Sequence, residues 1–248
     1  MSNNNDASAE MEFEYTGKGC VVPKDVTIVR FHPSVIKVEY RAFCDCKQLR
    51  EVIFNDGLKK IGQYAFYNCT SLSSITFPST VTEIGGAAFC DCKQLREVIL
   101  NEGLQKIGFG AFQECRSLSS IILPSTVTRV GGSAFRFCNS LREVVFHGVP
   151  REIGLRALQE CTSLGRFTFP TISNRLDTLI QTGHWEEIEN EVDEVRGVVE
   201  RSSGGELFVS TQTMGGSRNW NRVRRDIEKI VRLVVFYESQ LPILDIAF

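Results

Sequence analysis

The chain has 248 residues, of which 42% are hydrophobic and 23% are charged, and its formal net charge is −2. This balance is typical of a folded soluble protein, and the small net charge gives no bulk attraction to nucleic acid or to an anionic membrane. We therefore expect neither as a partner. No stretch approaches the ~18 apolar residues of a membrane-spanning helix, and the amino terminus lacks the apolar run of a secretory signal. These observations predict a cytoplasmic protein.

The first 25 residues lack the pattern that follows them. Residues 1–11 are mostly polar, and we expect them to be disordered. Residues 12–25 lead directly into a periodic region that begins at Val26. We expect them to form an amino-terminal cap that covers the first unit of this region.

A period of 23 residues governs residues 26–170. The pair Ala42-Phe43 returns at every step of 23 residues, and it is altered only in the last unit, to Ala157-Leu158. Each pair is followed by a cysteine and then by a leucine, at intervals of three residues; the cysteines are Cys46, Cys69, Cys92, Cys115, Cys138 and Cys161. Because no unit can bury its own apolar side, the units must stack into a solenoid.

The apolar positions within a unit predict its local structure. When each of these leucines is counted as position 1, apolar residues stand at positions 1, 4, 6, 10 and 13 of the unit, for example at Leu72, Ile75, Phe77, Val81 and Ile84. Positions 1, 4 and 6 predict a short strand with these side chains turned inward, ended by a proline or by Asn-Asp-Gly. We expect a short helical turn at each Ala-Phe pair. The predicted fold class is therefore an α/β solenoid.

One unit reads Ile61-Gly62-Gln63-Tyr64-Ala65-Phe66-Tyr67-Asn68-Cys69-Thr70-Ser71-Leu72. This sequence resembles the BspA-type leucine-rich repeat, whose units read roughly I-G-x-x-A-F-x-x-C-x-S-L. The resemblance covers residues 26–170 and implies a leucine-rich-repeat solenoid. Proteins of this class are scaffolds with varied partners, so the resemblance implies a fold and no particular activity.

A second period lies on top of the first. Residues 44–89 and 90–135 align without gaps and are identical at 33 of 46 positions, so the chain repeats a block of two units. Strand positions 2, 3 and 5 are expected to face solvent on the concave side, where Arg-Glu-aliphatic rows alternate with serine-rich rows. We predict that a partner protein binds this face at Arg50, Glu51, Ile53, Arg96, Glu97, Ile99, Ile122, Arg142, Glu143, Val145 and Arg166. The alternative is that these charges pair with one another and only keep the surface soluble.

The nine cysteines are expected to be reduced, and the six periodic ones to be small buried hydrophobes. Cys44 and Cys90 are expected nearer the surface. Cys44-Asp45-Cys46 is a weak metal motif, because the second such pair lies two units away, so we expect no metal and no cofactor. The three histidines, His32, His147 and His184, have no catalytic partner in the sequence, and no nucleophile motif is present. These observations predict that the protein is not an enzyme.

Residues 171–248 change in character and predict a helical carboxy-terminal segment. An acidic helix is expected from Asn174 to about Glu200, then a break at Ser202-Ser203-Gly204-Gly205, then a basic helix over about 218–238. Together they would form an antiparallel helical hairpin. This hairpin would either cap the solenoid or join two subunits, and in the second case residues 174–238 would form a homodimer.

The two ends of the chain also carry a resemblance. Val22-Pro23-Lys24-Asp25-Val26 and Asn219-Trp220-Asn221, with the sequences around them, resemble predicted repeat proteins of diatoms, which implies one family architecture without a known activity. Taken together, the residues predict a non-catalytic scaffold that binds another protein. The alternative is a self-assembling module that dimerises through its carboxy-terminal helices.

Overall fold

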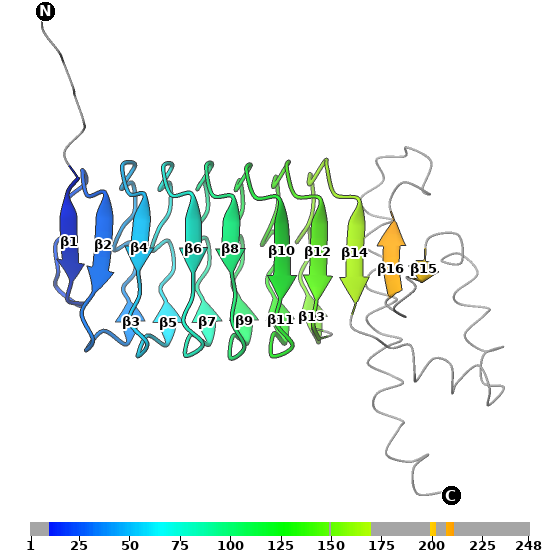
Figure 1. Cartoon of the computed structure of the whole chain (residues 1–248), viewed down its shortest axis with the longest axis horizontal. Helices are drawn as coiled ribbons and strands as arrows, with labels where there is room; N and C mark the ends of the chain where they lie inside the picture. The colour runs from blue at the N-terminus through cyan, green and yellow to red at the C-terminus, as the bar shows by residue number, and fades with distance from the viewer. Residues whose placement is uncertain (1–9, 149, 170–198, 202–206, 211–248) are drawn as a thin grey trace, which may run out of the picture.

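The computed structural model describes residues 10–148, 150–169, 199–201 and 207–210, and most of these wind into a solenoid of parallel strands (Figure 1). Each complete coil contributes one longer strand and one two-residue strand, which belong to different sheets. The longer strands are β1 (Glu12–Tyr15), β2 (Ile28–Phe31), β4 (Glu51–Ile53), β6 (Ser74–Thr76), β8 (Glu97–Ile99), β10 (Ser120–Leu123), β12 (Glu143–Phe146) and β14 (Arg166–Phe169). The short strands are β3 (Lys37–Val38), β5 (Lys60–Ile61), β7 (Glu83–Ile84), β9 (Lys106–Ile107), β11 (Arg129–Val130) and β13 (Glu152–Ile153).

Strand pairing follows the repeat without slippage. Ser74 pairs with Glu97 and Ser120 pairs with Glu143, so equivalent residues of successive coils lie side by side. The predicted inward positions are confirmed, since Leu72, Ile75 and Phe77 and their equivalents in the next coils are buried. The short strands form one continuous sheet from β3 to β13. The hydrogen-bonded ladder of the longer strands, in contrast, is interrupted between β4 and β6 and between β8 and β10.

The predicted helical turn at the Ala-Phe pair is wrong, and the described residues contain no helix. An α-helix needs each N–H to donate to the carbonyl four residues earlier. Here the donors alternate: Phe43 N and Asp45 N donate to Ala65 O and Tyr67 O of the next coil, at 2.7 and 2.8 Å. Cys44 N donates locally, to Arg41 O at 3.1 Å. Half of the donors therefore tie the coils together, and the described solenoid is a β-structure.

This ladder of turns places two residues of each coil in the left-handed backbone region. One set has φ between 50° and 62° and consists of Arg41, Tyr64, Ala87, Gly110, Ser133 and Arg156. The second set has φ between 58° and 63° and consists of Asp45, Asn68, Asp91, Glu114, Phe137 and Glu160. Asp and Asn tolerate this region better than most residues, whereas Glu114 and Phe137 adopt it because the ladder imposes it.

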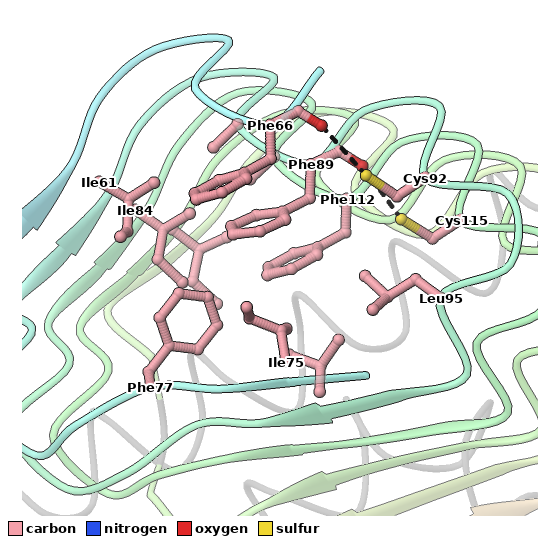
Figure 2. Close-up of a cluster of buried hydrophobic side chains, with 14 of the residues drawn as sticks. Ile61, Phe66, Ile75, Phe77, Ile84, Phe89, Cys92, Leu95, Phe112 and Cys115 are labelled. Carbon is pink, nitrogen blue, oxygen red and sulfur yellow. Dashed lines mark hydrogen bonds between the residues drawn. The ribbon is translucent and has the colours of Figure 1, made fainter. Parts of the chain in front are cut away.

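The core is a column of aromatic rings beside a column of thiols (Figure 2). Phe66, Phe89 and Phe112 stack with ring centroids 5.0 and 5.4 Å apart and ring planes within 8° of parallel. Cys92 Sγ donates to Phe66 O and Cys115 Sγ to Phe89 O, each at 3.2 Å. The periodic cysteines are buried, as predicted. They also supply a hydrogen-bond donor to a buried carbonyl, which a purely hydrophobic residue would not do.

Residues 10–25 add an incomplete coil before the first full one. β1 pairs in parallel with β2, and the buried Tyr15 ring lies 5.0 Å from Phe43, at the amino-terminal end of the aromatic column. Its hydroxyl accepts a hydrogen bond from Glu39 N at 3.2 Å. These contacts cover the first ring of the core; that residues 12–25 act as a cap for stability or solubility stays a prediction.

The predicted carboxy-terminal helical hairpin is not supported. Its first helix was expected to reach about Glu200, but β15 (Val199–Arg201) and β16 (Leu207–Ser210) are strands that pair antiparallel with each other. β16 also pairs antiparallel with β14, so the sheet continues beyond residue 170. An open strand edge offers unpaired N–H and C=O groups, which overrides local helix preference. Residues 174–198 and 218–238 of the predicted hairpin lie outside the described residues. Residues 1–9, for which disorder was expected, lie outside them as well.

Candidate functional site

The outer side of the longer strands, called the long-strand face below, begins at carbonyl groups that accept two hydrogen bonds each. Arg50 N and Glu51 N both donate to Thr27 O, at 2.8 and 3.2 Å. Arg96 N and Glu97 N share Ser73 O in the same way, at 2.8 and 3.4 Å. No residue is inserted, since Ile28 still pairs with Glu51 and Ser74 with Glu97 at the constant interval of 23 residues. Arg50 and Arg96 come directly before β4 and β8, and in both coils the arginine and the glutamate that follows it are exposed.

The predicted site residues lie on this face in three lines that run across the strands. Arg50, Arg96 and Arg142 form the arginine line, and all three are exposed. The next line carries Glu51 and Glu97, which are exposed, Glu143, which is half-buried, and the exposed Arg166. The third, called the aliphatic line, contains Ile53, Ile99, Ile122 and Val145; Ile99 and Ile122 are 41% and 47% exposed, and the other two are half-buried. Thr76 interrupts the aliphatic line.

The charges of this face remain largely unpaired. Arg166 lies 3.9 Å from Glu143, and Thr168 Oγ1 donates to the same carboxylate at 3.3 Å. Within the described part of the chain, Arg50, Arg96, Arg142, Glu51 and Glu97 form no side-chain ion pair or hydrogen bond. The short-strand face behaves differently, because Lys60 pairs with Glu83 at 3.0 Å and Arg129 with Glu152 at 2.8 Å on the neighbouring coil. Ion pairs therefore join neighbouring coils at two places on the short-strand face, whereas the centre of the long-strand face has none among the described residues.

A groove of about 640 Å³ opens on the long-strand face where the strand ladder is interrupted between β8 and β10. Four predicted site residues, Arg96, Glu97, Ile99 and Ile122, line it. Sequence reasoning missed the remaining residues around it, which come from β8 and β10, from the residues next to these two strands, and from the turn after β12: Val98, Leu100, Asn101, Glu102, Ser119, Ser120, Pro124 and His147. The sequence could have identified these residues, because each occupies a defined position of the 23-residue repeat next to a predicted site residue.

Two of these turn residues are held in place by the neighbouring coil. Asn101 Nδ2 donates to Phe77 O at 2.5 Å. Ser125 N and Ser125 Oγ donate to Glu102, at 3.1 and 2.9 Å, and the backbone donor lowers the pKa of the Glu102 carboxyl. The side of the groove formed by Asn101 and Glu102 is therefore fixed by hydrogen bonds to neighbouring coils. The side chains of Arg96 and Glu97, at the beginning of β8, have no such bonds among the described residues and can contact a ligand.

The duplicated block gives an internal comparison of surfaces. Of the six outward-facing strand positions of the first block, only Thr76 differs in the second, where it is Ile122. The other five, Arg50, Glu51, Ile53, Ser73 and Ser74, return as Arg96, Glu97, Ile99, Ser119 and Ser120. The turn side has diverged more, for example from Gln63 to Phe109, from Tyr64 to Gly110 and from Asn68 to Glu114. Since the two copies began alike, these strand positions have changed less than the turn positions around Gln63, Tyr64 and Asn68.

The turn side carries cysteines but no candidate chemistry. Cys44 and Cys90 are 3% and 8% exposed, so the expectation that they lie near the surface is wrong. The Arg41 guanidinium lies over Cys44, with Nη2 3.3 Å from Sγ, and the Lys24 ammonium donates to Cys44 O, so long basic side chains cover this thiol. Burial raises the pKa of Cys46 to about 11 and that of Cys90 to about 12. Among the described residues, no cluster of His, Cys, Asp or Glu could hold a metal ion.

Within the same part of the chain, no helix is long and apolar enough to cross a membrane.

This geometry defines a class of protein, the leucine-rich-repeat solenoid with 23-residue coils. The family model described as "BspA type Leucine rich repeat region" matches the chain in six copies over residues 17–139 and 59–180, which is more than half of its length. The chain therefore belongs to the family of BspA-type leucine-rich-repeat proteins. No curated protein sequence matches it.

Solved structures of bacterial leucine-rich-repeat proteins are similar to this chain. The leucine-rich repeat protein of T. pallidum is 29% identical with a TM-score of 0.53, over 58% of this chain and 68% of the other. A leucine-rich repeat protein from Bacteroides ovatus is 30% identical with a TM-score of 0.51, over 56% of this chain and 38% of the other. The likeness supports the coil architecture, and the match spans well under half of the second protein.

Proposed function

We propose that the protein is a non-catalytic scaffold that binds a partner protein through its long-strand face. The family supplies the scaffold, since repeat proteins of this kind are generally not catalysts. The observation that carries the proposal is that three evenly placed arginines are exposed and unpaired within the described residues, while two ion pairs, Lys60–Glu83 and Arg129–Glu152, join neighbouring coils on the short-strand face. Unpaired arginine beside exposed isoleucine has the composition that is enriched at the centre of protein interfaces.

The groove between β8 and β10 supports the same proposal. It lies at the middle of the arginine line and the aliphatic line, where Ile99 and Ile122 are the most exposed members of the latter. Central positions contribute most to binding because surrounding contacts exclude water from them. We infer that the partner's anchoring side chain enters this groove, and that Arg50 and Arg142 contact the partner on either side of it.

The test is affinity capture with the full-length protein, followed by mass spectrometry. The first variant reverses the arginine line, with Arg50→Glu, Arg96→Glu and Arg142→Glu. The matched control reverses three exposed charges of the short-strand side that form no ion pair within the described residues, with Lys59→Glu, Lys106→Glu and Arg151→Glu. Both variants change the net charge by the same amount, and circular dichroism verifies that both are folded.

The proposal requires a protein that the unaltered chain and the control variant retain and that the arginine-line variant loses. Reversal of three interfacial charges at 1–3 kcal/mol each weakens binding by ~100-fold or more. Equal capture by the arginine-line variant would refute the assignment of this face.

A further inference from the structure

At its amino-terminal end the solenoid finishes in a strand that has a partner on one edge only. β1 pairs in parallel with β2, and no other part of the chain that the structure describes pairs with it. Figure 1 shows β1 as the first of the row of longer strands, each of which otherwise lies between two neighbours. A strand with a free edge presents unpaired backbone N–H and C=O groups to its surroundings.

The hydrogen bonds to the following coil show which backbone groups of β1 are free. Met11 O and Tyr15 O accept hydrogen bonds from N–H groups of that coil, at 3.0–3.1 Å. The N–H and C=O groups of one residue point to the same edge of a strand, and successive residues alternate between the two edges. The odd-numbered residues therefore face β2, whereas Glu12 and Glu14 direct their N–H and C=O groups to the open edge. These four groups have no hydrogen-bond partner within the described residues.

The free backbone groups require a partner in an extended conformation. They recur every two residues along β1, ~6.6–6.8 Å, which is the interval at which a second strand offers its own donors and acceptors. A helix cannot replace that strand, because its backbone N–H and C=O groups bond to one another within the helix. The open edge is therefore suited to the addition of a strand, in which main-chain hydrogen bonds provide affinity and alternate side chains provide specificity.

The side chains of this edge are acidic. Glu10, Glu12 and Glu14 are exposed and occupy every second position, whereas Phe13 between them is half-buried and packs against the core. Glu12 forms an ion pair with Arg30, and Glu14 forms none within the described residues. A strand that is added here therefore places its own alternate side chains beside carboxylates on the outer side and beside an aromatic ring on the inner side.

The same alternation disfavours a second copy of this chain as the occupant. In an antiparallel pair, the residues that exchange hydrogen bonds stand directly opposite each other. On the open edge these are the even-numbered residues, so every register that pairs two or more of these positions sets one glutamate opposite another. Like charges directly opposite are destabilising, whereas opposite charges in the same place are stabilising. The edge therefore favours a basic strand over its own copy.

We propose that β1 binds an extended segment of a partner protein in which Lys or Arg alternates with apolar residues. The segment adds a strand to the open edge, and its backbone bonds to the N–H and C=O groups of Glu12 and Glu14. Its basic side chains lie beside the two carboxylates, and its apolar side chains cover the part of Phe13 that is still exposed. This binding site lies at the end of the solenoid and involves neither the arginine line nor the groove between β8 and β10.

The first experiment measures amide hydrogen exchange in the full-length protein by NMR, with and without the blocked peptide Lys-Val-Lys-Val-Lys-Val. In the free protein, the amides of Glu12 and Glu14 should exchange rapidly and those of Phe13 and Tyr15 slowly. The peptide should slow exchange at Glu12 and Glu14 by about 10-fold when its concentration is about ten times its Kd. Slow exchange at these two amides before the peptide is added would show that the edge is already covered, and would overturn the proposal.

The second experiment tests the strand geometry through the backbone of the peptide. One version carries N-methyl groups on its lysines and another carries them on its valines, so that each version lacks the donors of one edge. Strand addition requires that one version binds about 5- to 150-fold more weakly, as the loss of two hydrogen bonds would give, and that the other binds like the parent peptide. Equal binding of the two methylated versions would contradict the proposal.

The third experiment removes the carboxylates from the protein. The variant Glu12→Gln/Glu14→Gln should bind the lysine-valine peptide about 2- to 30-fold more weakly, as the loss of two exposed ion pairs would give. The matched control Asp56→Ser/Glu152→Gln also removes one exposed carboxylate that is unpaired within the described residues and one that pairs with an arginine. This control should bind the peptide like the unaltered chain. Equal binding by the two variants would overturn the assignment of a basic partner strand.

Discussion

The tight contact between coils at Gly85 gives a prediction whose size follows from the structure. A Cβ added there would lie 2.7 Å from Gln63 N and 2.8 Å from Ile61 O, whereas ordinary van der Waals contact begins at 3.4 Å. The Gly85→Ala variant must therefore separate the two coils by ~0.6–0.7 Å, or shift the turn by a similar amount. φ at Gly85 lies outside the left-handed region, so the close approach alone requires glycine.

This displacement has a direct cost in hydrogen bonds. Gly85 N donates to Ile61 O at 2.9 Å, and Tyr64 N donates to Gly86 O at 2.9 Å. Lengthening each by ~0.7 Å takes them beyond the normal range for N–H···O bonds. Two weakened bonds at ~0.5–1.5 kcal/mol each, or an equivalent overpacking strain, lower the free energy of unfolding by about 1–3 kcal/mol.

The neighbouring glycine is a matched control. At Gly86 an added Cβ meets Phe109 O at 3.3 Å and Gln63 Nε2 at 3.4 Å, and φ is not in the left-handed region. Gly86→Ala should therefore change the free energy of unfolding by less than ~1 kcal/mol, because the loss of unfolded-state entropy offsets the mild contact. Urea denaturation followed by circular dichroism compares the two variants. Equal midpoints for Gly85→Ala and Gly86→Ala would refute the reasoning about coil contact.

Two further predictions concern the core. Phe89→Ala removes a ring stacked between Phe66 and Phe112 and should lower the free energy of unfolding by about 3–5 kcal/mol in the same assay. The control Phe109→Ala removes a ring that is 67% exposed and should lower it by less than ~0.5 kcal/mol. Similar values for the two variants would contradict the stacked column. Burial raises the pKa of Cys46 to about 11 and that of Cys161 to about 12, so these thiols stay protonated in the folded chain above pH 9, where they ionise in the unfolded chain. These thiols should leave the free energy of unfolding unchanged below pH 9 and lower it above pH 9 by up to ~1.4 kcal/mol per pH unit for each thiol. Urea midpoints measured at pH 7, 9 and 10.5 should therefore decline less in the Cys46→Ala/Cys161→Ala variant than in the unaltered chain. A flat profile of the unaltered chain above pH 9 would show that the thiols are accessible to water.

The sequence by itself determined the length of a coil and the direction of most of its side chains. A 23-residue period in Leu, Phe and Cys can be buried in only one way when identical units stack, because each inward position must lie on its equivalent in the next coil. The burial of Leu72, Ile75 and Phe77 and the pairing of Ser74 with Glu97 followed from that alone. The exposed positions of the long-strand face were predictable for the same reason, including Arg50 and Arg96.

Only the tertiary structure decided the features that depend on a neighbouring coil. The Ala-Phe turn has a local sequence compatible with a helical turn, but Phe43 N and Asp45 N find their acceptors 22 residues away on the next coil. The same holds at the carboxy-terminal end, where the open edge of β14 gives β16 a partner that local propensity cannot anticipate. Whether Arg96 pairs with a neighbour or stands free beside a groove depends on how side chains of adjacent coils meet. The period of the sequence determines which residues of successive coils lie side by side, and contacts between the coils determine the backbone conformation of each turn and the pairing of each strand.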